Sequence, residues 1–177
     1  MTGLVVDGTG FEVLVGDERI GPRRVIDSAD VELLEGLAAR YVRAVQARCD
    51  AGVFVELGRE LSGWLDGDQA QLSALLERAA RPLVFEVRGP RSPSDRAWAV
   101  LRAPFELLAS PGGGFLAADE LVRFCVVRRL GQVGQRPVLD GFRLGLAFMA
   151  SSPRGQHELD FEAEEGAFPL ISWRHRL

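Results

Sequence analysis

An apolar segment late in the chain, residues 144–150, constrains the fold more than any other part of the sequence. A strand that is apolar on both faces belongs in the middle of a sheet that is covered on both sides. The acidic, helix-prone residues 157–167 follow it, and the order strand, loop, helix is the first half of a βαβ unit. We therefore expect a second region at 137–177 that begins an α/β core, after an N-terminal α/β module at 1–136.

The N-terminal part alternates strand and helix patterns. Short β-branched runs separated by Asp-Gly and Gly-Asp pairs are typical of strands joined by tight turns. Apolar residues at helical spacing predict amphipathic helices further along. The predicted elements are strands at 4–6 and 11–15 and helices at 28–48, 55–65 and from residue 68, the last two forming a helical hairpin. Asp27 or Ser28 is expected to cap the first helix, and Asp68 with Gln71 has capping-box spacing at the third.

The stretch between these helices and the apolar strand is predicted to consist of short elements. We expect a strand at 82–89, an exposed loop at 89–95, a compact apolar segment at 103–108, a glycine-rich turn at 110–114, a strand at 121–130 and a linker at 131–137. Together these patterns predict a mixed α/β fold, with N-terminal strands and a helical hairpin ahead of an incomplete α/β core.

Composition excludes several classes of function. All 21 basic residues are Arg, so there is no lysine for a Walker A motif, a Schiff base or a Ser-Lys dyad. A net charge of −4 with scattered Arg predicts neither nucleic-acid nor anionic-membrane binding. The longest apolar run is far shorter than a membrane helix, and the first residues lack a signal-peptide pattern, so we expect a cytoplasmic protein. Cys49 and Cys125 are too few for a disulfide framework or zinc site, and no cofactor or metal is expected.

Two loops match ligand-binding patterns in part. Residues 66–77 resemble a calcium loop at their first, third and twelfth positions, but Gln71 replaces the required glycine and Ala70 replaces a ligand. Helix capping is the favoured interpretation. Residues 111–115 contain three glycines that could approach a phosphate. Without a GK[ST] or GxGxxG motif, a plain loop is favoured there.

The C-terminal region holds residue types used in catalysis. Ser151, Ser152, His157 and Asp160 include every member of a hydrolase triad, but no GxSxG elbow is present, so a loop with a helix cap is favoured. Three acids at helical spacing could act as ligands or acid/base groups, and a solvated face near a helix start is favoured for them. They are Glu158, Glu162 and Glu165.

Cysteine and arginine residues in the predicted strand at 121–130 give two further candidates. Positive charge near Cys125 would favour a thiolate, yet neither His157 nor His175 stands in a motif suited to a general base, so we expect a buried structural thiol. Cys49 is a weaker candidate. Arg128 and Arg129 could clamp a phosphate or carboxylate, and ion pairs with local acids are the favoured alternative.

Several short blocks resemble the CHAT family of caspase-like cysteine peptidases over about residues 82–165. The blocks are 103–108 (Ala-Pro-Phe-Glu-Leu-Leu), 114–117 (Gly-Phe-Leu-Ala), 124–129 ending in Val-Arg-Arg, 143–153, and 159–165. Phe105 stands where the family commonly has Trp. The last two blocks are similar to the first strand and first helix of the family's caspase-like core.

The resemblance implies a caspase-like fold, often joined to helical repeats in bacterial signalling or defence proteins, with a Cys nucleophile activated by a His. In the family both residues follow later strands, and neither motif occurs after Arg143 here, so no residue is assigned as catalytic. The sequence also departs from the family pattern after Glu165, which suggests a truncated or frameshifted end.

Three hypotheses follow for the function. The first is a non-catalytic N-terminal fragment or remnant of a CHAT-type protein. The second is a self-sufficient module that binds another protein chain through its Arg-bearing strand or a free sheet edge. The third is an intact peptidase that uses Cys125 with an unrecognised His. We also expect the isolated chain to aggregate or dimerise, because a central strand without its neighbours exposes edges and apolar surface.

Overall fold

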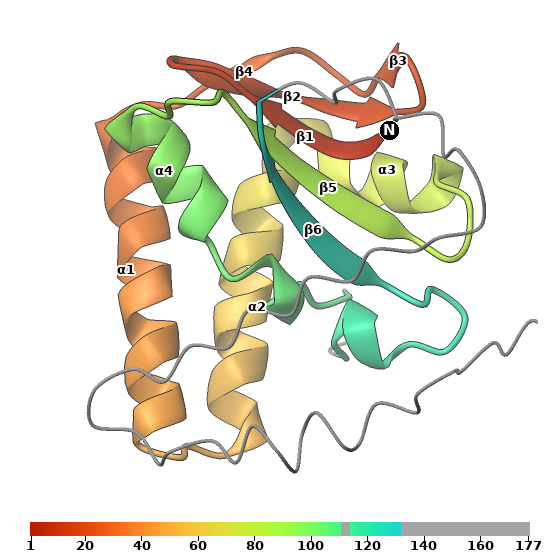
Figure 1. Cartoon of the computed structure of the whole chain (residues 1–177). Coiled ribbons are helices and arrows are strands. Elements are labelled where there is room, and N and C mark those ends of the chain that lie inside the picture. Colours follow the sequence, from red (N-terminus) through yellow and green to blue (C-terminus); the bar gives the residue numbers. More distant parts are fainter. Residues whose placement is uncertain (111–113, 132–177) are drawn as a thin grey trace, which may run out of the picture. The chain divides into compact units, whose positions relative to one another are not determined.

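The structure is a computed structural model that describes residues 1–110 and 114–131 (Figure 1). These residues belong to one compact unit, Met1–Gly134. The strands in this part of the chain are β1 (Thr2–Val6), β2 (Gly10–Val15), β3 (Glu18–Arg19), β4 (Arg24–Val25), β5 (Val84–Gly89) and β6 (Cys125–Leu130). The α-helices are α1 (Ser28–Gln46), α2 (Ala51–Asp66), α3 (Gln71–Arg78) and α4 (Asp95–Arg102). The predicted mixed α/β class is therefore confirmed.

The described strands form one mixed sheet in the order β3-β2-β1-β5-β6, with β4 beside β2. β1 and β2 are antiparallel, as expected for strands joined by a short turn, whereas β1–β5 and β5–β6 are parallel. The connection from β5 to β6 contains α4, so the two strands can run in the same direction. β6 is the edge of the sheet among the described strands.

The two faces of the sheet differ in burial. Leu4, Phe85 and Val87 are fully buried in the core that also contains the inward side chains of all four helices. The opposite face, called the outer face below, carries the residues that alternate with these, and Val84 is 47% exposed there. The register places Val84 beside Cys125, Glu86 beside Val127, and Arg88 beside Arg129 on this outer face. The described helices therefore cover one face of the sheet.

The first helix begins where the sequence predicts. Asp27 accepts a hydrogen bond from Asp30 N–H at 2.9 Å, and Asp27 N–H donates to the Asp30 carboxylate at 3.1 Å, which completes a capping box. Figure 1 shows α1 and α2 side by side. The indole N–H of Trp64 in α2 donates to Asp30 at 2.8 Å, so the cap of one helix also holds the other.

The predicted capping box at the third helix is wrong. Gln71 is fully buried, and its Nε2 donates to Ile20 O at 3.1 Å and Pro22 O at 2.8 Å. Asp66 instead accepts from Ser73 N–H at 3.0 Å and from its hydroxyl at 3.1 Å. Contacts with the loop after β3 therefore override the local capping pattern.

Several boundaries differ from the predicted ones. α2 begins at Ala51, with Asp50 as its cap, rather than at residue 55. α4 was not predicted, because its eight residues directly follow a loop rich in Pro, Ser and Arg. Residues 121–122 lie in a turn and 123–124 are irregular, so the predicted strand at 121–130 begins only at Cys125, as β6.

The expected region at 137–177, with its apolar strand at 144–150 and acidic helix at 157–167, lies outside the described residues. Within the described ranges, no helix is both long and apolar enough to span a bilayer.

Candidate functional site

The prediction that Cys125 is a buried thiol is wrong. Cys125 is exposed, because β6 lies at the edge of the described sheet and the Cys125 side chain points to the outer face. Cys49 is half-buried after the end of α1. His157 and His175 lie outside the described residues, so the structure places no imidazole beside either thiol within residues 1–110 and 114–131.

The segment 66–77, which matches a calcium loop in part, contains hydrogen bonds from Ser73 to Asp66 near the start of α3, whose cap residue Ala70 makes no side-chain capping bond. The carboxylate of Asp66 is engaged by Ser73, as described above, and no group of three or more His, Cys, Asp or Glu residues suited to a metal ion occurs in the described part of the chain. Residues 111–113 of the glycine-rich loop lie outside that part, as do the candidates of the C-terminal region. The latter are Ser151, Ser152, His157, Asp160, Glu158, Glu162 and Glu165.

Arg128 points to the helix-covered face and anchors β6 there. Its guanidinium donates to Leu101 O at 2.7 Å, to Ala103 O at 2.8 Å and to both carboxylate oxygens of Glu106. Burial raises the pKa of Glu106, but the hydrogen bonds and charge of Arg128 outweigh it and hold that pKa below its usual value. This ion pair confirms the favoured interpretation for Arg128.

Three blocks of the CHAT resemblance meet at this anchor. Phe105 and Phe124 both pack against Phe85 of β5, with ring centroids 5.6 Å and 5.8 Å apart. Leu116 N–H donates to Leu108 O at 2.8 Å, which joins the second block to the first. One continuous cluster beside β5 and β6 is thus formed by the three segments 103–108, 114–117 and 124–129.

Arg129 points to the outer face and shares an acid with its neighbour. Its Nε donates to Glu86 Oε1 at 3.0 Å, and Arg88 Nε donates to the same oxygen at 3.0 Å. Arg88 and Arg129 stand directly opposite each other on β5 and β6, a like-charge pair that would be unfavourable without the carboxylate between them. Arg129 is thus also in an ion pair, as favoured.

Among the described strands, only β5 pairs with the backbone of β6. Cys125 N–H donates to Leu83 O at 3.0 Å, and Gly131 N–H donates to Gly89 O at 2.9 Å. Because inward and outward amides alternate along a strand, the amides of Val126, Arg128 and Leu130 face away from β5. No described strand pairs with that side, which we call the free edge of β6.

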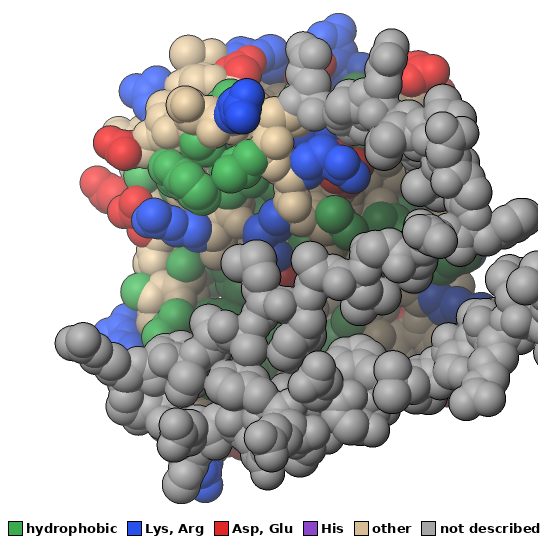
Figure 2. Space-filling view, viewed as in Figure 1, with side chains coloured by type: hydrophobic (Ala, Val, Ile, Leu, Met, Phe, Trp, Pro, Cys, Tyr) green, Lys and Arg blue, Asp and Glu red, His purple; other side chains and the backbone are tan. Residues whose placement is uncertain are grey.

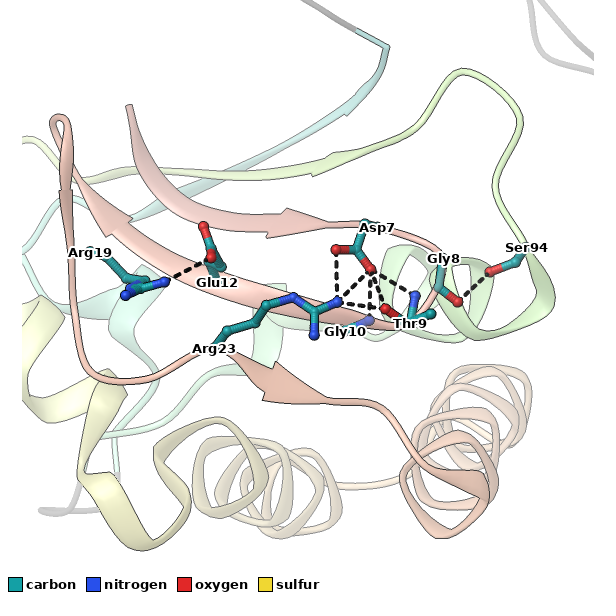
Figure 3. A network of polar contacts seen from close by, with 8 residues as sticks. All are labelled: Asp7, Gly8, Thr9, Gly10, Glu12, Arg19, Arg23 and Ser94. Carbon is teal, nitrogen blue, oxygen red and sulfur yellow. Dashed lines mark hydrogen bonds and ion pairs between the residues drawn. The ribbon is translucent and has the colours of Figure 1, made fainter.

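A second polar cluster fixes the β1–β2 turn (Figure 3). Asp7 Oδ1 accepts from Thr9 N–H at 2.7 Å and Gly10 N–H at 2.9 Å, and Arg23 Nη2 lies 2.8 Å from Oδ2. The bond from Arg23 is the largest of the effects that hold the pKa of Asp7 well below its usual value. Both carboxylate oxygens of Asp7 accept hydrogen bonds from neighbouring residues. We therefore interpret this cluster, called the Asp7 staple below, as one that stabilises the β1–β2 turn rather than as a reactive centre.

Figure 2 shows how charged side chains are distributed on one face of the described residues. On the face viewed in Figure 2, arginine side chains lie among hydrophobic and neutral ones and do not gather in one basic patch.

Comparison with known proteins finds no matching family model, no matching curated protein and no matching solved structure.

Proposed function

We propose that this chain is the non-catalytic N-terminal part of a CHAT-family, caspase-like protein of the bacterial cytoplasm that serves signalling or defence. In this proposal its N-terminal α/β module acts as a protein-interaction module, and the free edge of β6 accepts a strand from another protein. The observation that carries the proposal is the position of β6. Most of the resembling block 124–129 lies in β6. β6 is also the strand at the edge of the described sheet that pairs with β5 alone.

The CHAT part of the proposal rests on the resemblance of short blocks in the sequence. The first three of these blocks contact one another around Phe85 and the Arg128–Glu106 pair.

The exposed edge supports the interaction part. A strand with outward amides is a template for another strand, and recognition by strand addition takes its affinity from main-chain hydrogen bonds. β6 lacks the proline and lysine that often protect edges, and Leu130 at its end is 48% exposed.

The self-sufficient module remains the second candidate, and the core favours it. The described residues from Leu4 to Phe124 already form a buried cluster that includes side chains from all four helices. Both candidates use the same edge and differ only in ancestry.

Strand addition is tested with an uncharged, fluorescent peptide of alternating valine and threonine residues and the full chain. Fluorescence anisotropy should report binding. Leu130→Pro removes one outward amide and should weaken binding, whereas Leu130→Ala keeps that amide and trims the same side chain as a control. Equal binding by the two variants, or none by the unmodified chain, would contradict the proposed edge.

The absence of catalysis is tested with a peptidyl electrophile directed at cysteine peptidases. We expect it to label Cys125 no faster than a simple alkylating reagent does. A thiol that no base activates, outside a substrate-binding site, does not react faster when the reagent carries a peptide. Selective labelling of Cys125 that disappears in His157→Ala would instead establish the peptidase hypothesis.

Ancestry is tested by the nucleotide sequence that adjoins the codon for Leu177. A His-Gly turn and a later Cys-bearing strand encoded there, in any frame, would support the CHAT origin. Their absence there, and from the genes beside it, would favour the independent module.

A further inference from the structure

The outer face next to the free edge carries more positive than negative charge. Glu86 Oε1 lies 2.9 Å from Arg88 Nη2 and 3.0 Å from Arg129 Nε, so one carboxylate serves two guanidinium groups. The Glu86 side chain is 15% exposed, whereas that of Arg129 is 43% exposed. The trio therefore has a net charge of +1 when all three are ionised, and its accessible member is the one on β6.

This excess charge lies within reach of a strand added to β6. Arg129 belongs to β6, and side chains directly opposite each other on neighbouring strands lie close enough to interact. The terminal nitrogens of Arg129 have no hydrogen-bond partner among the described residues, since only its Nε is bonded, to Glu86. A guanidinium with free N–H groups binds a carboxylate well.

The other face of the edge is apolar. Val126 packs partly against the core, and Leu130 is 48% exposed on the same side of the strand. Arg128, which lies between them, is already paired with Glu106 and two backbone carbonyls. An added strand would therefore meet positive charge on the outer face and apolar side chains on the helix-covered face.

We propose that the free edge of β6 binds an extended acidic peptide strand that alternates acidic and apolar residues. Its carboxylates lie on the outer face beside Arg129, and its apolar side chains lie beside Val126 and Leu130. This inference rests on the strand-addition function proposed above and adds the chemistry of the partner. A second copy of β6 fits less well, because its own outer face is basic and it would bring another Arg129 to the same side.

The probes are three fluorescent peptides of equal length, in which valine alternates with glutamate, lysine or threonine. Binding to the full chain is measured by anisotropy at low and high salt. We expect the glutamate peptide to bind about tenfold or more tighter than the lysine peptide at low salt, and the difference to shrink at high salt.

Two variants separate charge recognition from folding. Arg129→Gln alters a partly exposed side chain and should weaken binding of the glutamate peptide about two- to fivefold while leaving the threonine peptide unchanged. Glu86→Gln removes the compensating carboxylate and should tighten binding of the glutamate peptide, although it removes an ion pair from the fold. A residue with a merely structural role would not improve binding when replaced.

The outcomes distinguish the two proposals. If all three peptides bind equally and Leu130→Pro weakens them all, strand addition stands and the acidic partner is wrong. If none binds, the strand-addition function itself fails. If the glutamate peptide is preferred but Arg129→Gln has no effect, its carboxylates do not meet Arg129 and this inference is overturned.

Discussion

Gly58 of α2 packs directly against the backbone of Leu107, so closely that a Cβ at Gly58 would lie 1.9 Å from the Leu107 carbonyl oxygen. Leu107 belongs to the 103–108 block, which the short 3-10 helix Phe105–Leu107 holds against α2. Helix α2 can therefore approach the 103–108 segment, which anchors β6, this closely only because residue 58 is a glycine.

We predict that Gly58→Ala lowers the free energy of unfolding by about 1–3 kcal/mol, because the methyl group overpacks a site bounded by backbone. Chemical denaturation followed by circular dichroism measures the change. Gly63→Ala on the same helix is the matched control, since nothing lies within 4 Å of its added Cβ. That variant should gain about 0.5–1 kcal/mol through helix propensity. Equal effects would show that the contact with Leu107 is not limiting.

A side chain at Gly3 should destabilise the fold as much as one at Gly58, for two reasons. Its φ of 142° suits glycine, and an added Cβ would lie 2.0 Å from Glu86 O across the β1–β5 pair. We predict that Gly3→Ala costs about 1–3 kcal/mol and speeds amide exchange in both strands. Gly8→Ala, in the adjoining turn, meets nothing within 4 Å and should have little effect. Unchanged exchange in β5 would count against the close approach.

Neighbouring arginines on β6 should differ sharply in their effect on stability. Arg128→Met leaves Glu106, Leu101 O and Ala103 O without a donor, so we expect a loss of about 1–3 kcal/mol. Arg129→Gln removes an ion pair that is 43% exposed on the arginine side and should cost less than about 1 kcal/mol. Thermal unfolding of the two variants provides the measurement. A reversed order would contradict the anchoring role of Arg128.

The Asp7 staple predicts a pH dependence. The pKa of Asp7 in the folded protein lies well below its value of 3.8 in an unfolded chain, so its contribution to stability is present above that value. The contribution is lost as the pH falls through the folded pKa. Asp7→Asn should therefore lower stability near neutral pH, by about 1 kcal/mol or less because the carboxylate is 57% exposed.

Urea unfolding of Asp7→Asn and the unmodified chain, at neutral pH and well below pH 3.8, measures this effect. The difference between the two proteins should shrink at the lower pH. If the difference in the free energy of unfolding grew at lower pH, its sign would be opposite to that expected for a lowered pKa. Asp7 would then not stabilise the fold in the way predicted.

Local patterns predicted the elements that depend on neighbouring residues. Apolar residues at helical spacing, with Asp27 or Ser28 as the expected cap, placed the start of α1 correctly, because a helix start is specified by side chains within a single turn. The strand at 82–89 and the Asp-Gly turn between β1 and β2 were found for the same reason. The failure at Asp68 and Gln71 came from a contact between residues far apart in sequence, which no local pattern contains.

The candidate site also has residues that the sequence indicated and residues that only the structure revealed. The sequence identified Arg128, Arg129 and Cys125 as notable, since charge and a thiol in a strand are visible without coordinates. It did not identify Glu86 or Arg88, because their pairing with Arg129 depends on the parallel register of β5 with β6. The alternation of an apolar residue with a charged one in β5 was the only signal for a solvated face there.

The sequence by itself determined that the chain is mixed α/β, that a long helix follows a cap at Asp27 or Ser28, and that lysine chemistry is excluded. Only the tertiary structure decided that β6 is an edge of the described sheet, that Cys125 is exposed, and that two arginines share one carboxylate. The physical reason is that helix caps and turns are settled by interactions within a few residues. Strand order and register are settled by which distant segments bury the most apolar surface together.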